Sequence, residues 1–203
     1  MVFPISKRTL FPLVGLFIRK ITGIKNIPQE GPFIVVANHD SYADPFIITS
    51  VILKVLNKKI HFLAMKGRFW NKFGNTVSRK WAGCIPLDEG KKKALEEMKN
   101  LLKKGEVIGL FPGGPRSSDG SLPRGKTGSV RLALATKAPI LPIGIDGAYD
   151  IAPGDKLIPK LKRCEVNIGK LIYITAKKKV TKKLLDDMTS NVMRQIAILS
   201  KKN

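Results

Sequence analysis

Residues 33–45 read FIVVANHDSYADP, so a short apolar run passes directly into a polar loop that holds one of the chain's two histidines. The first five residues are rich in β-branched side chains and follow a Gly-Pro pair, a pattern that predicts a buried strand. His39 therefore follows the carboxyl end of a strand, where α/β sheets place their ligands. Asp44, five residues further on, could orient the imidazole and leave its second nitrogen free as a general base.

The same spacing also has a purely structural explanation. Asp44 precedes Pro45, and an aspartate cap followed by proline at the first helical position is a common way to begin a helix. A loop histidine beside such a cap needs no catalytic role. The choice between the two interpretations depends on the rest of the chain.

Outward from this stretch, strand and helix patterns alternate. The predicted strands are 33–37, 60–64, 84–87, 106–111, 140–145 and a strand or hairpin at 164–174, and the predicted helices are 44–56, 66–80, 91–104, 127–136 and 181–199. This alternation predicts a single α/β domain in which a largely parallel, mixed sheet is flanked by helices. The domain is expected to occupy residues 23–203.

Residues 1–22 are predicted to form an amphipathic segment that contacts a membrane through an N-terminal helix. Two pairs of basic residues flank its apolar residues, which suits a helix lying in the interface of a bilayer. Its longest charge-free stretch, residues 9–18, is about half the length needed to span the hydrocarbon core, so no spanning helix is predicted. An ordinary helix packed on the domain explains the same pattern.

The charge of the chain indicates an anionic partner. A net charge of +22 in 203 residues favours nucleic acid, an anionic membrane surface or an acidic protein. Only 7% of the residues are aromatic and lysines outnumber arginines, which makes nucleic acid the weaker choice. Cys84 and Cys164 match no metal-ligand spacing and indicate a reducing compartment. We therefore expect no resident cofactor or metal, and a place at the cytoplasmic face of a membrane.

A glycine-rich segment, FPGGPRSSDG at residues 111–120, leaves the predicted strand at 106–111. Glycines let backbone amides approach an anion, and Arg116 could bind a phosphate or carboxylate. The overlapping string GSLPRGKT at residues 120–127 satisfies the nucleotide-binding P-loop pattern, which makes a P-loop protein an alternative. A P-loop should pass directly from a strand into a helix, however, and a polar stretch intervenes here.

Four blocks of the sequence, in order, resemble the signature of the glycerolipid acyltransferases of the lysophosphatidic acid acyltransferase type. The blocks are NHDSYADP at residues 38–45, GCIPLD at 83–88, FPGGPRS at 111–117 and APILPIGI at 138–145. Four ordered blocks are far more specific than one short string. The resemblance covers residues 20 to 175, roughly three quarters of the chain.

The resemblance implies transfer of a fatty acyl group from acyl-CoA or an acidic acyl carrier protein (acyl-ACP) to the hydroxyl of a lysophospholipid. The expected acceptor is 1-acylglycerol-3-phosphate, which would give phosphatidic acid, and the acyl donor is a substrate rather than a cofactor. His39 would be the general base and Asp44 its orienting partner. The enzyme would work on an anionic membrane surface as a peripheral or monotopic protein.

The resemblance also places substrate-binding residues. They are Arg116, Lys126 and Lys66 for the phosphate, Gly113 and Gly114 for backbone amides that face the oxyanion, and Ser117 in the same block. The chain departs from the family pattern at Gly113 and Pro115, where glutamate and threonine are usual, and at Glu89, where arginine is common. A catalytically degenerate, basic lipid-binding protein is therefore the other alternative.

Overall fold

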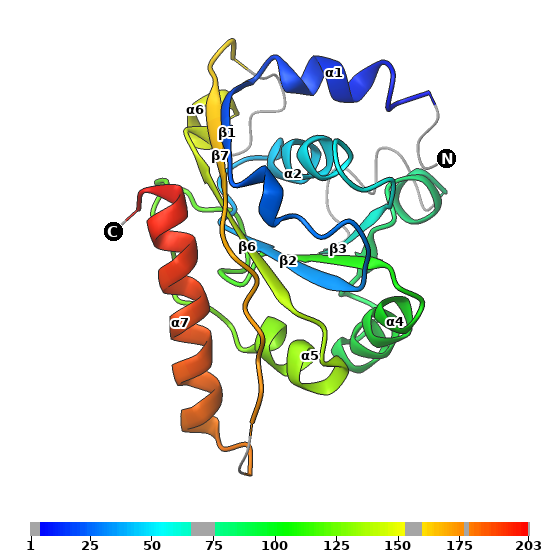
Figure 1. Ribbon diagram of the computed structural model, residues 1–203, viewed down its shortest axis with the longest axis vertical. Coiled ribbons are helices and arrows are strands. Elements are labelled where there is room, and N and C mark those ends of the chain that lie inside the picture. The colour runs from blue at the N-terminus through cyan, green and yellow to red at the C-terminus, as the bar shows by residue number, and fades with distance from the viewer. Residues whose placement is uncertain (1–4, 66–75, 153–159, 177–178, 203) are drawn as a thin grey trace.

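The computed structural model describes residues 5–65, 76–152, 160–176 and 179–202 (Figure 1). Its strands are β1 Ile18–Thr22, β2 Phe33–Ala37, β3 Ile60–Ala64, β4 Ile85–Pro86, β5 Val107–Leu110, β6 Ile140–Asp146 and β7 Cys164–Ile168. Its α-helices are α1 Leu10–Gly15, α2 Asp44–Ile52, α4 Lys91–Lys103, α5 Gly128–Thr136, α6 Ala148–Ile151 and α7 Lys182–Ser200, with a 3-10 turn at Ile24–Asn26 and a π-helical segment at Thr76–Trp81.

The seven strands form one sheet in the order β1-β7-β6-β2-β5-β3-β4. Every neighbouring pair is parallel except β6 and β7, which run antiparallel. Helices α1 and α2 cover one face of the sheet, and α4, α5 and α7 cover the other (Figure 1). The predicted fold class, a mostly parallel mixed sheet flanked by helices, is confirmed.

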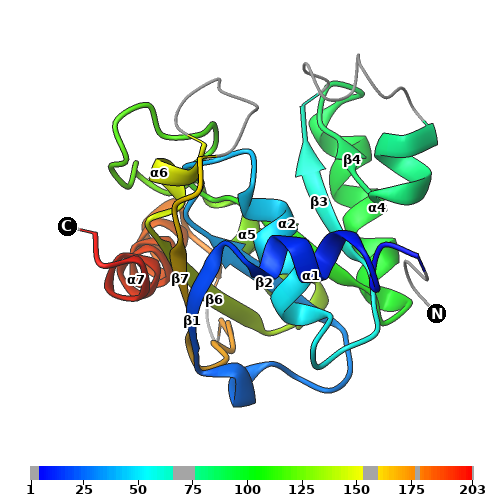
Figure 2. The ribbon, with the colours of Figure 1, turned by 90° about the horizontal axis from the view of Figure 1, so that it is seen from above.

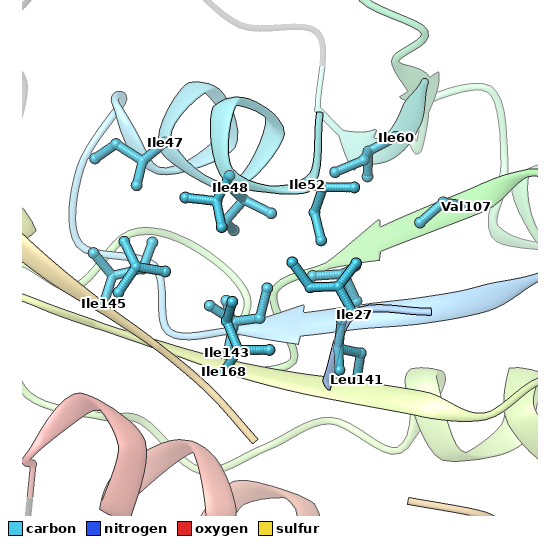
Figure 3. Packing of buried hydrophobic residues seen from close by; sticks show 14 of the residues in the cluster. Ile27, Ile47, Ile48, Ile52, Ile60, Val107, Leu141, Ile143, Ile145 and Ile168 are labelled. Atoms are coloured by element: carbon cyan, nitrogen blue, oxygen red, sulfur yellow. The ribbon is translucent and has the colours of Figure 1, made fainter. Parts of the chain in front are cut away.

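The central strand β2 explains why residues 33–37 are apolar throughout. Side chains alternate between the two faces of a strand, and both faces of β2 are covered by helices. Phe33, Val35 and Ala37 belong to the cluster under α2, whereas Ile34 and Val36 belong to the cluster under α4, α5 and α7. Figure 3 shows the first cluster, in which isoleucines of α2 lie over β6.

The N-terminal segment contains the predicted helix and also a strand that the sequence analysis did not predict. Helix α1 ends at Gly15, and the chain continues as β1, an edge strand that pairs with β7. The β-branched Ile18, Ile21 and Thr22 favour a strand, and basic side chains on its exposed positions protect the edge. The last five residues of segment 1–22 therefore belong to the sheet.

Other boundaries differ less. Helix α2 ends at Ile52 and not at residue 56, and most of the predicted helix at 66–80 lies outside the described residues. Its end, Thr76–Trp81, is π-helical rather than α-helical. In the described part of the chain, no helix is both long enough and apolar enough to cross a bilayer.

The topology places two loops side by side. Strand β2 lies between β5 and β6 and runs parallel to both, so the carboxyl ends of the three strands share one edge of the sheet. The loop after β2 carries His39, and the glycine-rich segment follows β5. The ligand edge of the sheet, as in other open α/β folds, is thus where the predicted site residues meet.

Candidate active site

His39 and Asp44 form a hydrogen-bonded pair at this edge. Nδ1 of His39 lies 2.8 Å from Oδ2 of Asp44, whose carboxylate is fully buried. The same oxygen accepts hydrogen bonds from the backbone N–H groups of Asp40 at 2.7 Å and Ser41 at 2.8 Å. Ala43 is the N-cap of α2, so Asp44 is not the helix cap that the structural explanation requires. Its carboxylate instead orients the imidazole and the loop.

The imidazole of His39 rests on an aromatic side chain. Its ring stacks on that of Phe111 with centroids 3.9 Å apart, and Phe111 in turn stacks on Phe62 of β3. Only 16% of the His39 side chain is exposed, and within the described chain its Nε2 makes no hydrogen bond. One nitrogen is thus held by a carboxylate while the other is available to accept a proton, the arrangement that general-base catalysis needs.

Asn38 ties the loop to the sheet, a role that the sequence analysis did not assign. Its side chain donates to the carbonyl of Ile145 and accepts from the N–H of Ile145, both at 2.8 Å. It also donates to Oδ2 of Asp40 at 2.6 Å. The feature of the sequence that could have indicated this role is an asparagine directly after an apolar strand. If such a residue is buried, its amide must form hydrogen bonds inside the protein.

The glycine-rich loop folds back on itself. The N–H of Gly114, whose φ is 91°, donates to the carbonyl of Phe111 at 2.9 Å, and the N–H of Lys126 donates to that of Pro112 at 2.8 Å. A Cβ atom at position 114 would lie 2.8 Å from Nζ of Lys126, so the ammonium lies directly over the turn. The loop therefore brings Lys126 and Gly114 together.

Position 113 has a packing reason to be glycine in this chain. A Cβ atom there would lie 2.7 Å from Cγ of Pro123, closer than such atoms approach without a shift. Glu89, the other departure from the family pattern, accepts hydrogen bonds from Arg79 and from Lys93, the latter at 2.8 Å. At both positions where the chain departs from the family pattern, the residue present therefore fits its neighbours in this fold.

Arg116 and Ser117 connect the two loops. The guanidinium of Arg116 lies 3.5 Å from the ring centroid of Tyr42, a cation–π contact that the sequence did not reveal. The N–H of Ser117 donates to the carbonyl of His39 at 2.8 Å. Its hydroxyl donates to Asp119 at 2.9 Å, so Ser117 contributes to the position of the histidine loop.

The other residues that could take part in binding or catalysis do not contribute to the site that the structure describes. Lys66 falls outside the described residues. Burial raises the pKa of Cys84 to about 11 and that of Cys164 to about 12, which keeps both thiols protonated and unreactive. His61 on β3 bonds the carbonyl of Gly83 and lies apart from the His39 pair. No cluster of three or more metal-binding side chains occurs among the described residues.

The P-loop string is not arranged as a phosphate cradle. Strand β5 ends at Leu110 and α5 begins at Gly128, so the motif does not follow the strand directly. The amide of Ser121 donates to Asp119, and that of Lys126 to Pro112. These two amides donate their hydrogen bonds within the loop. In a P-loop, by contrast, the backbone amides point towards the phosphate and are free to bind it.

The model of the family described as Acyltransferase matches residues 18–146. The 1-acyl-sn-glycerol-3-phosphate acyltransferase of Bacillus subtilis is 29% identical over 129 residues, which cover 63% of this chain and 62% of that protein. The chloroplastic 1-acyl-sn-glycerol-3-phosphate acyltransferase of Arabidopsis thaliana is 32% identical over 139 residues, covering 66% of this chain and 37% of that protein. The chain thus spans less than two thirds of the length of these relatives.

A solved structure has the same fold. The crystal structure of the 1-acyl-sn-glycerophosphate acyltransferase of Thermotoga maritima superposes with a TM-score of 0.67 at 22% sequence identity and covers 94% of this chain and 79% of that one. The family model includes the histidine loop, the glycine-rich loop and the strands that position them. The chain belongs to the acyltransferase family.

Proposed function

We propose that the protein transfers a fatty acyl group from a thioester, acyl-CoA or acyl-ACP, to the hydroxyl of a lysophospholipid at a membrane surface. The observation that carries the proposal is the 2.8 Å contact of His39 Nδ1 with the buried carboxylate of Asp44, with Nε2 left without a partner in the described chain. The preferred acceptor is 1-acylglycerol-3-phosphate, the substrate class in the names of the relatives.

The chemistry follows from this pair. An alcohol is a weak nucleophile near neutral pH, so Nε2 of His39 takes its proton while the oxygen attacks the thioester carbonyl. Asp44 stabilises the imidazolium that forms. The tetrahedral intermediate then collapses as the carbon–sulfur bond breaks, and the imidazolium returns the proton to the thiolate. The products are the ester and the free thiol, and no acyl-enzyme is required.

The glycine-rich loop supplies a candidate oxyanion donor. Within the described chain the amide of Gly114 is used in the turn with Phe111, whereas the amide of Gly113 makes no hydrogen bond. An amide aimed at the developing charge stabilises the transition state more than the ground state. We therefore assign this role to Gly113 and a supporting role to Gly114.

We expect Arg116→Ala to raise KM for a phosphorylated acceptor about tenfold or more, with a smaller effect on kcat, because the guanidinium can bind phosphate in a bidentate way. Arg116→Lys should restore little, since an ammonium neither stacks on Tyr42 in the same way nor forms a fork. Steady-state kinetics with an acceptor that lacks phosphate provide the control. An equal KM effect on both acceptors would contradict phosphate binding by Arg116.

Lys126, and Lys66 by resemblance, complete the proposed phosphate site.

Helix α1 and the residues on either side of it offer an apolar surface for a membrane. Leu13 and Leu16 are 59% and 63% exposed, and Ile5 is 76% exposed. Helix α1 packs beside α2, the helix that begins at Asp44 (Figure 2). Exposed leucines combined with a net charge of +22 suit peripheral binding to anionic lipid. The cytoplasmic face stays a prediction from cysteine usage.

We expect the double change of Leu13 and Leu16 to serine to weaken binding to anionic vesicles roughly 10- to 100-fold, because each buried methylene contributes about 0.8 kcal/mol. Sedimentation with vesicles of phosphatidylglycerol measures the effect. The matched control is Ile198→Ser, which removes a 65% exposed side chain from α7 on the other side of the sheet. Equal binding by the double variant and the wild type would rule out α1 as the contact.

The reaction itself is tested by acyl transfer from a labelled long-chain acyl-thioester to vesicles that carry a panel of lysolipids. Product that depends on His39 establishes the reaction, and the preferred lysolipid identifies the acceptor. Parallel assays with CoA and carrier-protein thioesters identify the donor. Absence of product with a folded, lipid-bound protein would favour the degenerate lipid-binding alternative instead.

A further inference from the structure

A lysine from the opposite end of the chain lies next to the His39–Asp44 pair. Nζ of Lys202 is 2.6 Å from Oδ2 of Asp40, the residue that follows the histidine. The same ammonium donates to the carbonyl of Gly120 in the loop after β5. One side chain thus joins the loop after β2, the loop after β5 and the segment after α7.

The fold delivers this lysine to the site. Helix α7 can lie against β6 because position 144 is glycine: a Cβ atom there would be 2.1 Å from the backbone of Leu199. Lys201, the residue after α7, has a left-handed φ of 54°, which ends the helix and redirects the chain. Figure 1 shows the end of α7 beside the carboxyl end of β6. The side chain of Lys202, which follows this end, reaches the carboxylate of Asp40.

Asp40 depends on a cation. The residue is only 2% exposed, and its Oδ1 is buried without a hydrogen bond in the described chain. Its Oδ2 accepts from Asn38 and Lys202. Burial raises the pKa of Asp40 above its usual value, and Lys202 opposes this rise. A buried carboxylate without a cation either takes up a proton or moves towards water.

We propose that Lys202 is a positioning residue for the acyl transfer proposed above, on which this inference rests. Its ammonium holds the Asp40 carboxylate and thereby the backbone on either side of that residue. That backbone carries His39, and its N–H at position 40 donates to Oδ2 of Asp44 at 2.7 Å. The ion pair therefore maintains the geometry in which the carboxylate of Asp44 orients the imidazole.

The charges around this pair define the expected pH dependence. The charged groups that act on the Asp40 carboxylate are Lys202, which lowers its pKa, and Asp44, which raises it. The same elements also carry Arg116, Asp119 and Lys126 after β5, Asp146 at the end of β6 and Lys201 after α7. Lys201 is already paired with Asp146 at 2.9 Å and with Glu165 at 2.7 Å. Lys202 donates a hydrogen bond to the Asp40 carboxylate at 2.6 Å.

The test is the pH profile of kcat for Lys202→Met. We expect kcat at about pH 8 to fall roughly 10- to 100-fold, with a much smaller change in KM, because the reacting groups are displaced rather than removed. As pH rises through the raised pKa of Asp40, its unpaired negative charge appears beside Asp44 and disrupts the loop. The variant should therefore gain a falling alkaline limb that the wild type lacks.

Three further variants separate this role from general stabilisation. Lys202→Arg should restore most of kcat, because it preserves the cation. Lys202→Met combined with Asp40→Asn should remove the alkaline limb and recover part of kcat, since the carboxylate that needs the cation is gone. Lys201→Met, the matched control, removes the neighbouring lysine with its surface ion pairs and should keep the wild-type pH profile.

Three different results would overturn the inference or part of it. A wild-type kcat and pH profile in Lys202→Met, with His39→Ala inactive, would remove the role of Lys202 and leave the acyl transfer intact. A wild type that transfers no acyl group to any lysophospholipid would remove the proposed function and this role with it. An unchanged alkaline limb after adding Asp40→Asn would also reject Asp40 as the group that Lys202 controls.

Discussion

Replacing His39 with alanine should lower kcat for acyl transfer by roughly 10²- to 10⁴-fold, the usual contribution of a positioned general base. The variant loses the imidazole that, in the proposed mechanism, takes the proton of the acceptor hydroxyl. Because the ring is replaced by a methyl group above Phe111, a modest loss of stability is also expected. Vesicle assays with saturating thioester and lysophospholipid measure the rate, and circular dichroism checks the fold.

His61→Ala is the matched control for this experiment. It removes the chain's other histidine, which bonds the carbonyl of Gly83 and lies on β3. This variant should keep kcat within a few-fold of the wild type, since His61 does not contact the His39 pair. Undiminished turnover in His39→Ala would exclude the proposed mechanism, whereas loss in both variants would indicate a general effect on the sheet.

Asp44→Asn should cost nearly as much activity, about 10²- to 10⁴-fold in kcat, although the side chain keeps its size. The carboxylate accepts from His39, Asp40 and Ser41, and it is fully buried. All three donors converge on Oδ2, and Oδ1 is buried without a hydrogen bond in the described chain. A neutral amide oxygen at Oδ2 is a weaker acceptor and carries no charge to orient and stabilise the imidazolium, and the amide nitrogen at Oδ1 would be buried without an acceptor. The free energy of unfolding should fall by about 1–3 kcal/mol.

Urea denaturation separates the two effects of Asp44→Asn. At low urea the variant remains folded, so its lower kcat reports the orientation of His39 rather than unfolding. Asp187→Asn, an exposed carboxylate on α7, serves as the control and should change neither quantity measurably. Wild-type kcat in a folded Asp44→Asn variant would mean that the histidine needs no carboxylate partner.

The core strands could be predicted because their signal is local. An unbroken run such as Phe33–Ala37 indicates a strand that is covered on both faces, and its neighbours in the sheet have similar runs. The edge strand β1 was not predicted, since its residues were assigned only to the amphipathic segment 1–22. Its residues gain their partners only from β7, near the other end of the domain, so nothing within the segment reveals the pairing.

The contact between His39 and Asp44 could be predicted because it is local, as the signal of β2 is. His39 and Asp44 lie five residues apart in one loop, and a chain of that length keeps their side chains within reach of each other in many loop conformations. Arg116 was predicted from the glycine-rich segment that carries it, but its contact with Tyr42 was not predicted. That contact joins two loops, and no local pattern predicts which side chains will face across them.

The amino-acid sequence by itself determined the alternation of elements, the central strands and a histidine–aspartate loop at a strand end, because hydrophobic periodicity and short spacings act over a few residues. Only the tertiary structure decided that Asn38 bonds Ile145, that Gly144 admits the end of α7, and that Lys202 pairs with Asp40. Those contacts arise when the parallel strands bring distant segments to one edge, so they are properties of the sheet and not of any single segment.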